Sequence, residues 1–302
     1  DYAAAVPLLR RWLEHEADIA DPNAAADVRF TLAEAVHRMG QGEEARRLLA
    51  AAQRYWETDP PRHADVLLTS RMLQARLQRE DGDPEGALAV LEAALRERRA
   101  RSGDEHYETA ALLTNLGAAY VQSGRLDEGI DVSRRALALW ERLQLGAGND
   151  ALNTLNNLAA AYFRKNDLER AEETFARALD LRRTLFGPSA ATAALIGNYA
   201  RVLQRLGRWD EALALGTEAE AMALAHAGSS SLLVQAMRVA RAETLLALGQ
   251  PGPAREALEA FSREDLAPLP VALRLRAALG TAEAAQKQKD RPAAADALAQ
   301  AE

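Results

Sequence analysis

Eight small residues recur along the 302-residue chain at an almost constant interval, and this regularity constrains the fold more than any other feature. They are Ala5, Ala45, Ala87, Gly129, Ala171, Ala212, Ala254 and Ala295, separated by 40 to 42 residues. A period held over a whole chain indicates stacked copies of one supersecondary unit, each of which packs on its neighbours. The sequence therefore predicts a solenoid.

Each copy has two further landmarks that define its internal structure. Five positions before the small residue stands a residue type that tolerates a left-handed conformation: Gly40, Gly82, Gly124, Asn166, Gly207, Gly249 and Asp290. Twelve positions before it, most copies carry a second small residue: Ala33, Ala75, Gly117, Ala159, Ala200 and Ala242. We therefore expect two helices joined by a tight turn in every copy, crossing closely where the small residues lie.

This register predicts seven helix–turn–helix repeats and one half repeat. The repeats are expected at about 24–58, 65–101, 108–144, 150–185, 191–226, 232–262 and 271–302. Residues 1–20 form the half repeat, because Tyr2 and Ala5 have the phase of a second helix. Since the pattern begins and ends inside a copy, we expect the chain to be a fragment of a longer, multi-domain protein. We treat residues 1–302 as a single solenoid.

The landmark residues resemble those of the tetratricopeptide repeat. One copy has Leu116, Gly117, Tyr120, Gly124, Leu126, Gly129 and Ala136, and the next has Leu158, Ala159, Tyr162, Asn166, Leu168, Ala171, Phe175 and Ala178. That repeat has a period of about 34 residues, so this chain resembles the longer repeats of kinesin light chains and of many bacterial signalling proteins. Segments 155–162 and 103–110 carry this resemblance. It implies an all-α, right-handed superhelix with the added length at the end of the second helix and in the loop between copies.

Several classes of function are disfavoured by composition and by missing motifs. A formal net charge of −7 argues against a general nucleic-acid binder, because phosphate contacts require clustered positive charge. The chain has no cysteine, and its five histidines lie far apart, so we expect no metal site. Phosphate-binding loops and catalytic signatures are not found, and we expect no catalytic residue, no enzyme activity and no cofactor.

No apolar run approaches the roughly 20 residues that cross a bilayer. The sequence therefore predicts no membrane-spanning segment. The absence of cysteine permits a reducing compartment. We expect a cytoplasmic location.

Polar residues on the predicted first helices are the candidates for a binding site. In such superhelices the first helices line the concave groove. The candidate peptide-binding residues are Arg76, Arg79, Thr114, Asn115, Asn153, Asn156, Asn157, Asn198, Arg201 and Gln204. Asparagine amides can bond the backbone of an extended peptide, and arginine can pair with its acidic groups. In kinesin light chains and relatives, matching asparagines contact bound peptides, so the resemblance implies this role above all for Asn156.

Structural roles compete with binding at these positions. Asn115, Asn157 and Asn198 occupy one equivalent position in successive copies and could bond the neighbouring helix pair instead. The arginines could pair with a groove carboxylate such as Glu34 or Glu243, or remain solvated. Trp56 and Trp140 are two periods apart, which favours packing between copies over contact with a ligand.

Three functions fit this sequence. The first is a protein-interaction scaffold whose groove holds a peptide or partner segment. Its extended repeats are similar to the C-terminal regions of bacterial serine/threonine kinases, where they would recruit substrates or regulators. The second is a sensor array of a multi-domain transcriptional regulator or ATPase switch, and the third is self-association.

Overall fold

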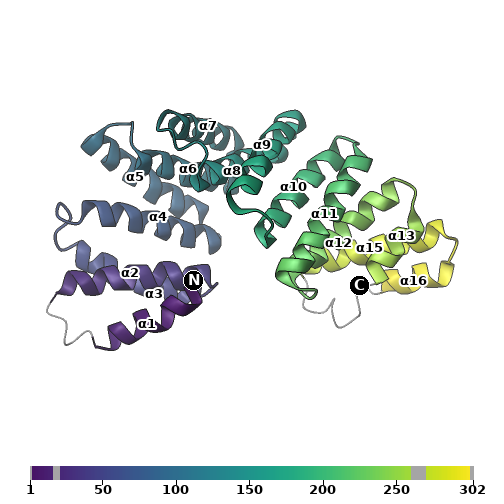
Figure 1. The fold of residues 1–302 in the computed structure, drawn as a ribbon, viewed down its shortest axis with the longest axis horizontal. Coiled ribbons are helices and arrows are strands. Elements are labelled where there is room, and N and C mark those ends of the chain that lie inside the picture. Colours follow the sequence, from purple (N-terminus) through teal and green to yellow (C-terminus); the bar gives the residue numbers. More distant parts are fainter. Residues whose placement is uncertain (1, 16–20, 260–269, 300–302) are drawn as a thin grey trace. The chain divides into compact units, whose positions relative to one another are not determined.

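The computed structural model of the chain describes residues 2–15, 21–259 and 270–299 (Figure 1). Within these ranges every regular element is an α-helix, which confirms the predicted all-α class. The ends of three predicted segments, at 16–20, 260–262 and 300–302, lie outside the described residues. Contacts divide the chain into two compact units, Asp1–Gly146 and Ala147–Glu302, and each is described by itself.

In residues 2–15 and 21–146, the first unit has one single helix followed by three helix pairs. The single helix is α1 (Tyr2–Glu14), and the pairs are α2 (Pro22–Arg38) with α3 (Gly42–Trp56), α4 (Ala64–Glu80) with α5 (Pro84–Ser102), and α6 (Tyr107–Gln122) with α7 (Leu126–Arg142). Each helix packs on the one before it, and the first helices α4 and α6 also touch each other. Helix α1 lies against α2, as a second helix does against the next first helix.

Four helix pairs lie in the described residues of the second unit. They are α8 (Asn149–Arg164) with α9 (Leu168–Phe186), α10 (Ala190–Arg205) with α11 (Trp209–Ala227), α12 (Leu232–Ala247) with α13 (Pro251–Glu259), and α15 (Val271–Lys287) with α16 (Arg291–Ala299). Successive helices pack together again. The first helix α12 also contacts the neighbouring first helices α10 and α15.

In every pair but the last, the predicted turn residue adopts the left-handed backbone conformation, with a positive φ. The expected residues have φ between 64° and 84° at Gly40, Gly82, Gly124, Asn166, Gly207 and Gly249. In the last pair Lys289 takes this conformation, with φ 62°, and the prediction of Asp290 was wrong by one residue. Asp290 instead caps α16, where its carboxylate accepts from the amide of Ala293 at 3.2 Å.

The small residues lie at the helix crossings in the interior copies. Ala45, Ala87, Ala171 and Ala254 are fully buried, and Gly129 is buried too. At the two ends this burial is lost, since Ala5 is half-buried and Ala295 is exposed. The exposure of Ala295 follows from the one-residue shift in the last turn. This shift moves the crossing position to Ala294, which is half-buried.

The added length of the repeat lies where the sequence predicts it. Helices α5, α9 and α11 are each 19 residues long, and Gly103, Gly187 and Gly228 end them with positive φ. The end of α5 is joined to the start of α6 by a buried ion pair, with Arg98 Nε 2.8 Å from Glu108 Oε2. This pair was not predicted from the sequence.

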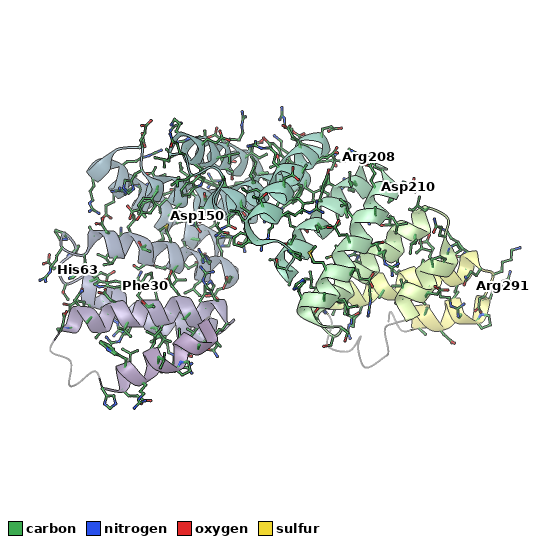
Figure 2. All side chains as sticks on the ribbon, in the orientation of Figure 1. Phe30, His63, Asp150, Arg208, Asp210 and Arg291 are labelled. Carbon is green, nitrogen blue, oxygen red and sulfur yellow. The ribbon has the colours of Figure 1, made fainter. Side chains whose placement is uncertain are left out.

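The two periodic tryptophans pack inside the first unit. Trp56 is fully buried and meets the ring of Phe30 edge-on, with 5.7 Å between the ring centres. Figure 2 labels the position of Phe30. Trp140 is 2 % exposed, and its indole N–H donates to the hydroxyl of Thr114 at 3.2 Å. Both tryptophans therefore stabilise helix packing.

Candidate binding surfaces on the first helices

The ten predicted site residues lie on four first helices, two in each unit. Helices α4 and α6 of the first unit carry Arg76, Arg79, Thr114 and Asn115. Helices α8 and α10 of the second unit carry Asn153, Asn156, Asn157, Asn198, Arg201 and Gln204. They therefore form two separate sets of residues.

In the first unit, both predicted residues of α6 are bonded within the fold. Thr114 is only 8 % exposed, donates to the carbonyl of Ala110 at 3.0 Å and accepts from Trp140. Asn115 is half-buried, and its amide donates to the carbonyl of Ala111 at 2.9 Å on the same helix. Thr114 thus acts as a packing residue, and Asn115 bonds its own helix rather than the neighbouring pair.

The arginines of α4 differ from each other. Arg79 and Gln122 of α6 bond reciprocally: the Arg79 Nε–H donates to the Gln122 side chain at 3.0 Å, and the Gln122 amide donates to the Arg79 carbonyl at 2.6 Å. Burial lowers the pKa of Arg79, and the positive charge of Arg76 adds to this effect. Arg76 is half-buried and forms no ion pair with the described residues. It is therefore the α4 arginine whose donors remain available.

The second unit presents a cation over an aromatic ring. The guanidinium groups of Arg201 and Arg205 lie 5.4 and 5.7 Å from the centre of the Phe163 ring, joining α10 to α8. Arg205 also donates to the Asn166 side chain at 2.6 Å. Arg201 is exposed and has no carboxylate partner among the described residues. Glu243, considered above as a partner, is bound by Arg276 through two contacts of 2.6 and 2.8 Å.

Four asparagines of this unit have side-chain amides without hydrogen-bond partners in the described part of the chain. Asn156 and Asn157 are half-buried on α8, and Asn153 on α8 and Asn198 on α10 are exposed. An amide provides two donors and one acceptor. The expected bonds from Asn157 and Asn198 to neighbouring helix pairs are thus not formed, and all four amides are free to bond a ligand.

Gln204 joins two first helices and has a structural role. Its amide nitrogen donates to the carbonyl of Ala240 at 3.0 Å and to the hydroxyl of Thr244 at 2.7 Å, both on α12. The same two helices approach closely at Gly197, where a Cβ atom would lie 2.5 Å from the sulfur of Met237. The packing of α10 on α12 therefore explains Gln204 without a ligand.

Two polar residues of these surfaces were not predicted. Gln122 was missed because its contact with Arg79 spans 43 positions in the sequence. Arg205 could have been found, since it lies one helical turn after Arg201 and therefore on the same face of α10.

Comparisons with known proteins agree with the helix-pair architecture. A sequence profile of the tetratricopeptide repeat matches residues 65–142, 108–184 and 150–225, and a second profile of this repeat matches 26–51. The chain belongs to the tetratricopeptide repeat family. The resemblance to this repeat and the predicted solenoid fold are therefore confirmed. The chain is a repeat scaffold for protein–protein interaction.

Solved structures share this fold at low sequence identity. BtubC (BKLC) from P. vanneervenii is 23 % identical, with a TM-score of 0.61 over 73 % of this chain and 88 % of that chain. A putative kinesin light chain from Podospora anserina, with nearly identical repeats, is 23 % identical, with a TM-score of 0.57 over 64 % and 92 %. The type IV pilus biogenesis factor PilW is 18 % identical, with a TM-score of 0.57 over 78 % and 91 %. No curated protein matches the chain.

Membrane-spanning helices and metal sites are both absent from the described residues. No helix among them is both long and apolar enough to cross a bilayer. No group of three or more histidine, aspartate or glutamate side chains in these ranges is arranged to hold a metal ion.

Proposed function

We propose that the chain binds an extended segment of a partner protein through its first helices, with α8 and α10 contributing most of the contacts. The observation that carries this proposal is the combination of Asn156, whose amide has no partner among the described residues, with Arg201 over Phe163. Asparagine amides suit the backbone of an extended peptide, and the free guanidinium suits an acidic group beside it. Arg76 would give the first unit a similar cationic contact.

The biological setting that we propose is a bacterial, cytoplasmic signalling protein. The extended repeats are similar to those of C-terminal regions of serine/threonine kinases, which supports a role in recruiting substrates or regulators. The alternative is the sensor array of a multi-domain transcriptional regulator or ATPase switch. Sequencing of the gene on either side of these repeats distinguishes the two: a kinase signature supports the first, and a nucleotide-binding phosphate loop supports the second.

A peptide library screened against the purified chain tests the binding proposal. The Asn156→Ala/Arg201→Ala double variant should lose binding of the selected peptides. The matched control is Asn149→Ala/Arg170→Ala, which also removes one asparagine and one arginine over an aromatic ring, since Arg170 lies 5.9 Å from the centre of the Tyr162 ring. Equal retention of peptides by both double variants would place the binding site elsewhere.

Self-association has one observation in its favour, on the last helix pair. Val271, Leu275 and Leu279 are 69 %, 41 % and 48 % exposed and lie one turn apart on α15. A second copy that covered this stripe would bury it. Light scattering over a range of concentrations tests this: wild type should form dimers and Leu275→Glu/Leu279→Glu should not, whereas a strictly monomeric wild type would exclude it.

A further inference from the structure

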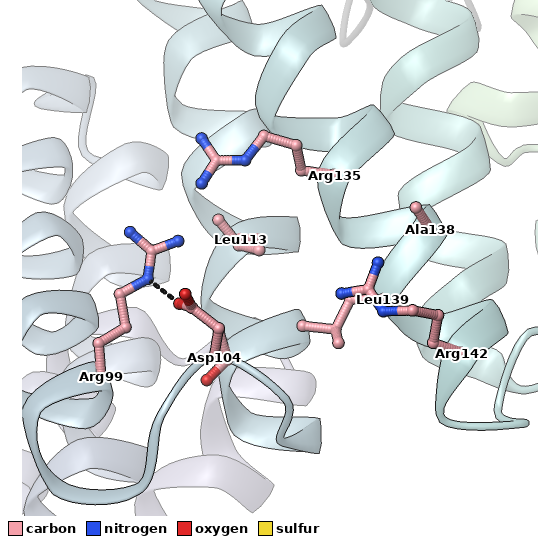
Figure 3. A pocket seen from close by; sticks show the side chains of 8 residues that line it. Arg99, Asp104, Leu113, Arg135, Ala138, Leu139 and Arg142 are labelled. Carbon is pink, nitrogen blue, oxygen red and sulfur yellow. Dashed lines mark ion pairs between the residues drawn. The ribbon is translucent and has the colours of Figure 1, made fainter.

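A pocket of about 230 Å³ lies between the second helices α5 and α7 and the start of α6 (Figure 3). Three arginines surround it, Arg99 from α5 and Arg135 and Arg142 from α7, together with leucine side chains. Its carboxylate, Asp104, is paired with Arg99 at 2.5 Å. None of the residues that line it belongs to the proposed function, whose residues lie on α4, α8 and α10.

Two of these arginines have only weak partners. Arg142 lies 3.4 Å from Glu105, and Arg135 lies 3.8 Å from Asp131 on its own helix. Those carboxylate side chains are 74 % and 71 % exposed. Solvent-exposed ion pairs of this kind contribute little to stability and are easily exchanged. Most of the N–H donors of Arg135 and Arg142 are therefore available to another anion.

The equivalent place in the second unit contains a carboxylate from the chain itself. Counted from the small residue of each second helix, Arg99 on α5 corresponds to Arg183 on α9, and Arg135 on α7 corresponds to Glu218 on α11. Arg183 donates to Glu218 at 2.6 Å. The α5–α7 pocket thus has the guanidinium of Arg135 at the position where the second unit has the carboxylate of Glu218, the partner of Arg183.

Equivalent threonines at the starts of α6 and α10 also differ in their hydrogen bonding between the two units. Thr192 on α10 is fully buried, and its hydroxyl donates to the carbonyl of Gly187 at 2.8 Å. The equivalent Thr109 lines the α5–α7 pocket, is 1 % exposed, and has a hydroxyl without a hydrogen-bond partner in the described structure. The second unit satisfies these groups internally. In the first unit Arg99 is paired with Asp104, but Arg135 and Arg142 have only the weak partners described above and the Thr109 hydroxyl has none in the described structure.

We propose that the α5–α7 pocket binds an oxyanion, the carboxylate or phosphate group of an acidic residue in a partner polypeptide. The oxyanion takes the place that Glu218 occupies in the second unit, beside Arg99, and accepts from Arg135 and Arg142. Arginine binds both groups through paired, charge-assisted hydrogen bonds. Leu113 and Leu139, which line the same pocket, accommodate the aliphatic part of the residue.

Titration of the complete chain with two capped amino acids tests this site. The probes are N-acetylglutamate amide, which carries a carboxylate, and N-acetylphosphoserine amide, which carries a phosphate. Ionic strength is held constant, because salt screens exposed charges. The Nε–H signals of ¹⁵N-labelled Arg135 and Arg142 should shift saturably with at least one probe, and the probe that saturates them identifies the group. Absence of a saturable shift with both probes overturns the proposal.

Charge reversal at two neighbouring arginines separates this pocket from general electrostatics. Arg135→Glu restores the carboxylate found at Glu218, and we expect it to lower the affinity for the probe at least tenfold, or about 1.4 kcal/mol. Arg134→Glu makes the same change in charge at an exposed position of α7 that does not line the pocket, and should lower affinity less than twofold. Equal losses in both variants overturn the proposal. Arg142→Ala, with an expected loss of the same order, provides a second test should Arg135→Glu fail to fold.

Discussion

Replacement of glycine by alanine should have opposite effects on stability at two helix positions: Gly129, at the close crossing of α6 and α7, and Gly216 in α11. At Gly129, a Cβ atom would lie 2.8 Å from Val121 Cγ2, 3.2 Å from the Val121 amide nitrogen and 3.3 Å from the Gly117 carbonyl oxygen. The last two are backbone atoms, so the two helices must move apart by a few tenths of an ångström. At Gly216 in α11 the nearest atom is the Cβ of Arg241 at 3.9 Å, an ordinary contact.

These distances give the sign and the size of the difference. Alanine is favoured over glycine in a helix interior by about 0.8–1 kcal/mol, so Gly216→Ala should stabilise the fold by up to about 1 kcal/mol. Gly129→Ala gains a similar helix propensity but overpacks the crossing, which costs about 1–3 kcal/mol. The free energy of unfolding should therefore be about 1–3 kcal/mol lower for Gly129→Ala than for Gly216→Ala.

Urea unfolding followed by far-UV circular dichroism measures this difference. Because helix pairs in a repeat array can open locally, hydrogen exchange of peptides from α6, α7 and α11 should accompany it. Faster exchange should appear in α6 and α7 of Gly129→Ala only. Equal free energies of unfolding for the two variants, with unchanged exchange in α6 and α7, would refute a tight crossing at Gly129.

Three other expectations concern buried polar groups. Glu108→Ala leaves the buried charge of Arg98 without its partner and should cost about 3–5 kcal/mol in urea unfolding, whereas replacing both residues by Leu and Met should recover most of this loss; a small effect of Glu108→Ala would contradict the buried pair. Thr192→Val loses the hydroxyl's bonds to Gly187, Ser189 and Arg182 and should cost about 1–3 kcal/mol, but Thr109→Val loses no bond and should be nearly neutral. Burial lowers the pKa of His37 below 6.5, so its neutral form is favoured in the folded state. The contribution of neutral His37 to the free energy of unfolding should therefore be complete above pH 6.5 and be lost as the pH falls. Thermal melts at several pH values should show a weaker pH dependence for His37→Gln than for wild type.

The sequence alone predicts the helix pairs because two kinds of position recur in every copy. One is the turn, which needs a residue that tolerates a positive φ, and the other is the helix crossing, which needs a small side chain. Gly40 and Asn166 end first helices with positive φ for this reason. The last turn was misplaced because Asp290 and Lys289 are adjacent, and the pattern favours aspartate, a residue type that tolerates this conformation. Lys289 adopts it in the structure, while Asp290 caps the next helix.

The partners of individual side chains are harder to predict, because they lie far apart in the sequence. Spacing places Thr114 and Asn156 at one equivalent position of their helices, yet Thr114 is bonded to Trp140, 26 residues away, and Asn156 has no such partner in the described chain. Gln204 likewise bonds Thr244, 40 residues away. Periodicity therefore identifies the candidate positions, and only the packed structure distinguishes the free amides from the bonded ones.

In four successive copies, the position eleven residues after the small residue alternates between tryptophan and arginine: Trp56, Arg98, Trp140 and Arg182. The next copy has Ala223 there. The tryptophans contact the first helix of their own pair, through Phe30 and Thr114, whereas the arginines bond the first helix of the following pair, through Glu108 and Thr192. These four copies are therefore of two kinds. An engineered array made from them should be lengthened or shortened in steps of two copies, because a single inserted copy would place Arg98 or Arg182 next to a first helix that lacks Glu108 or Thr192.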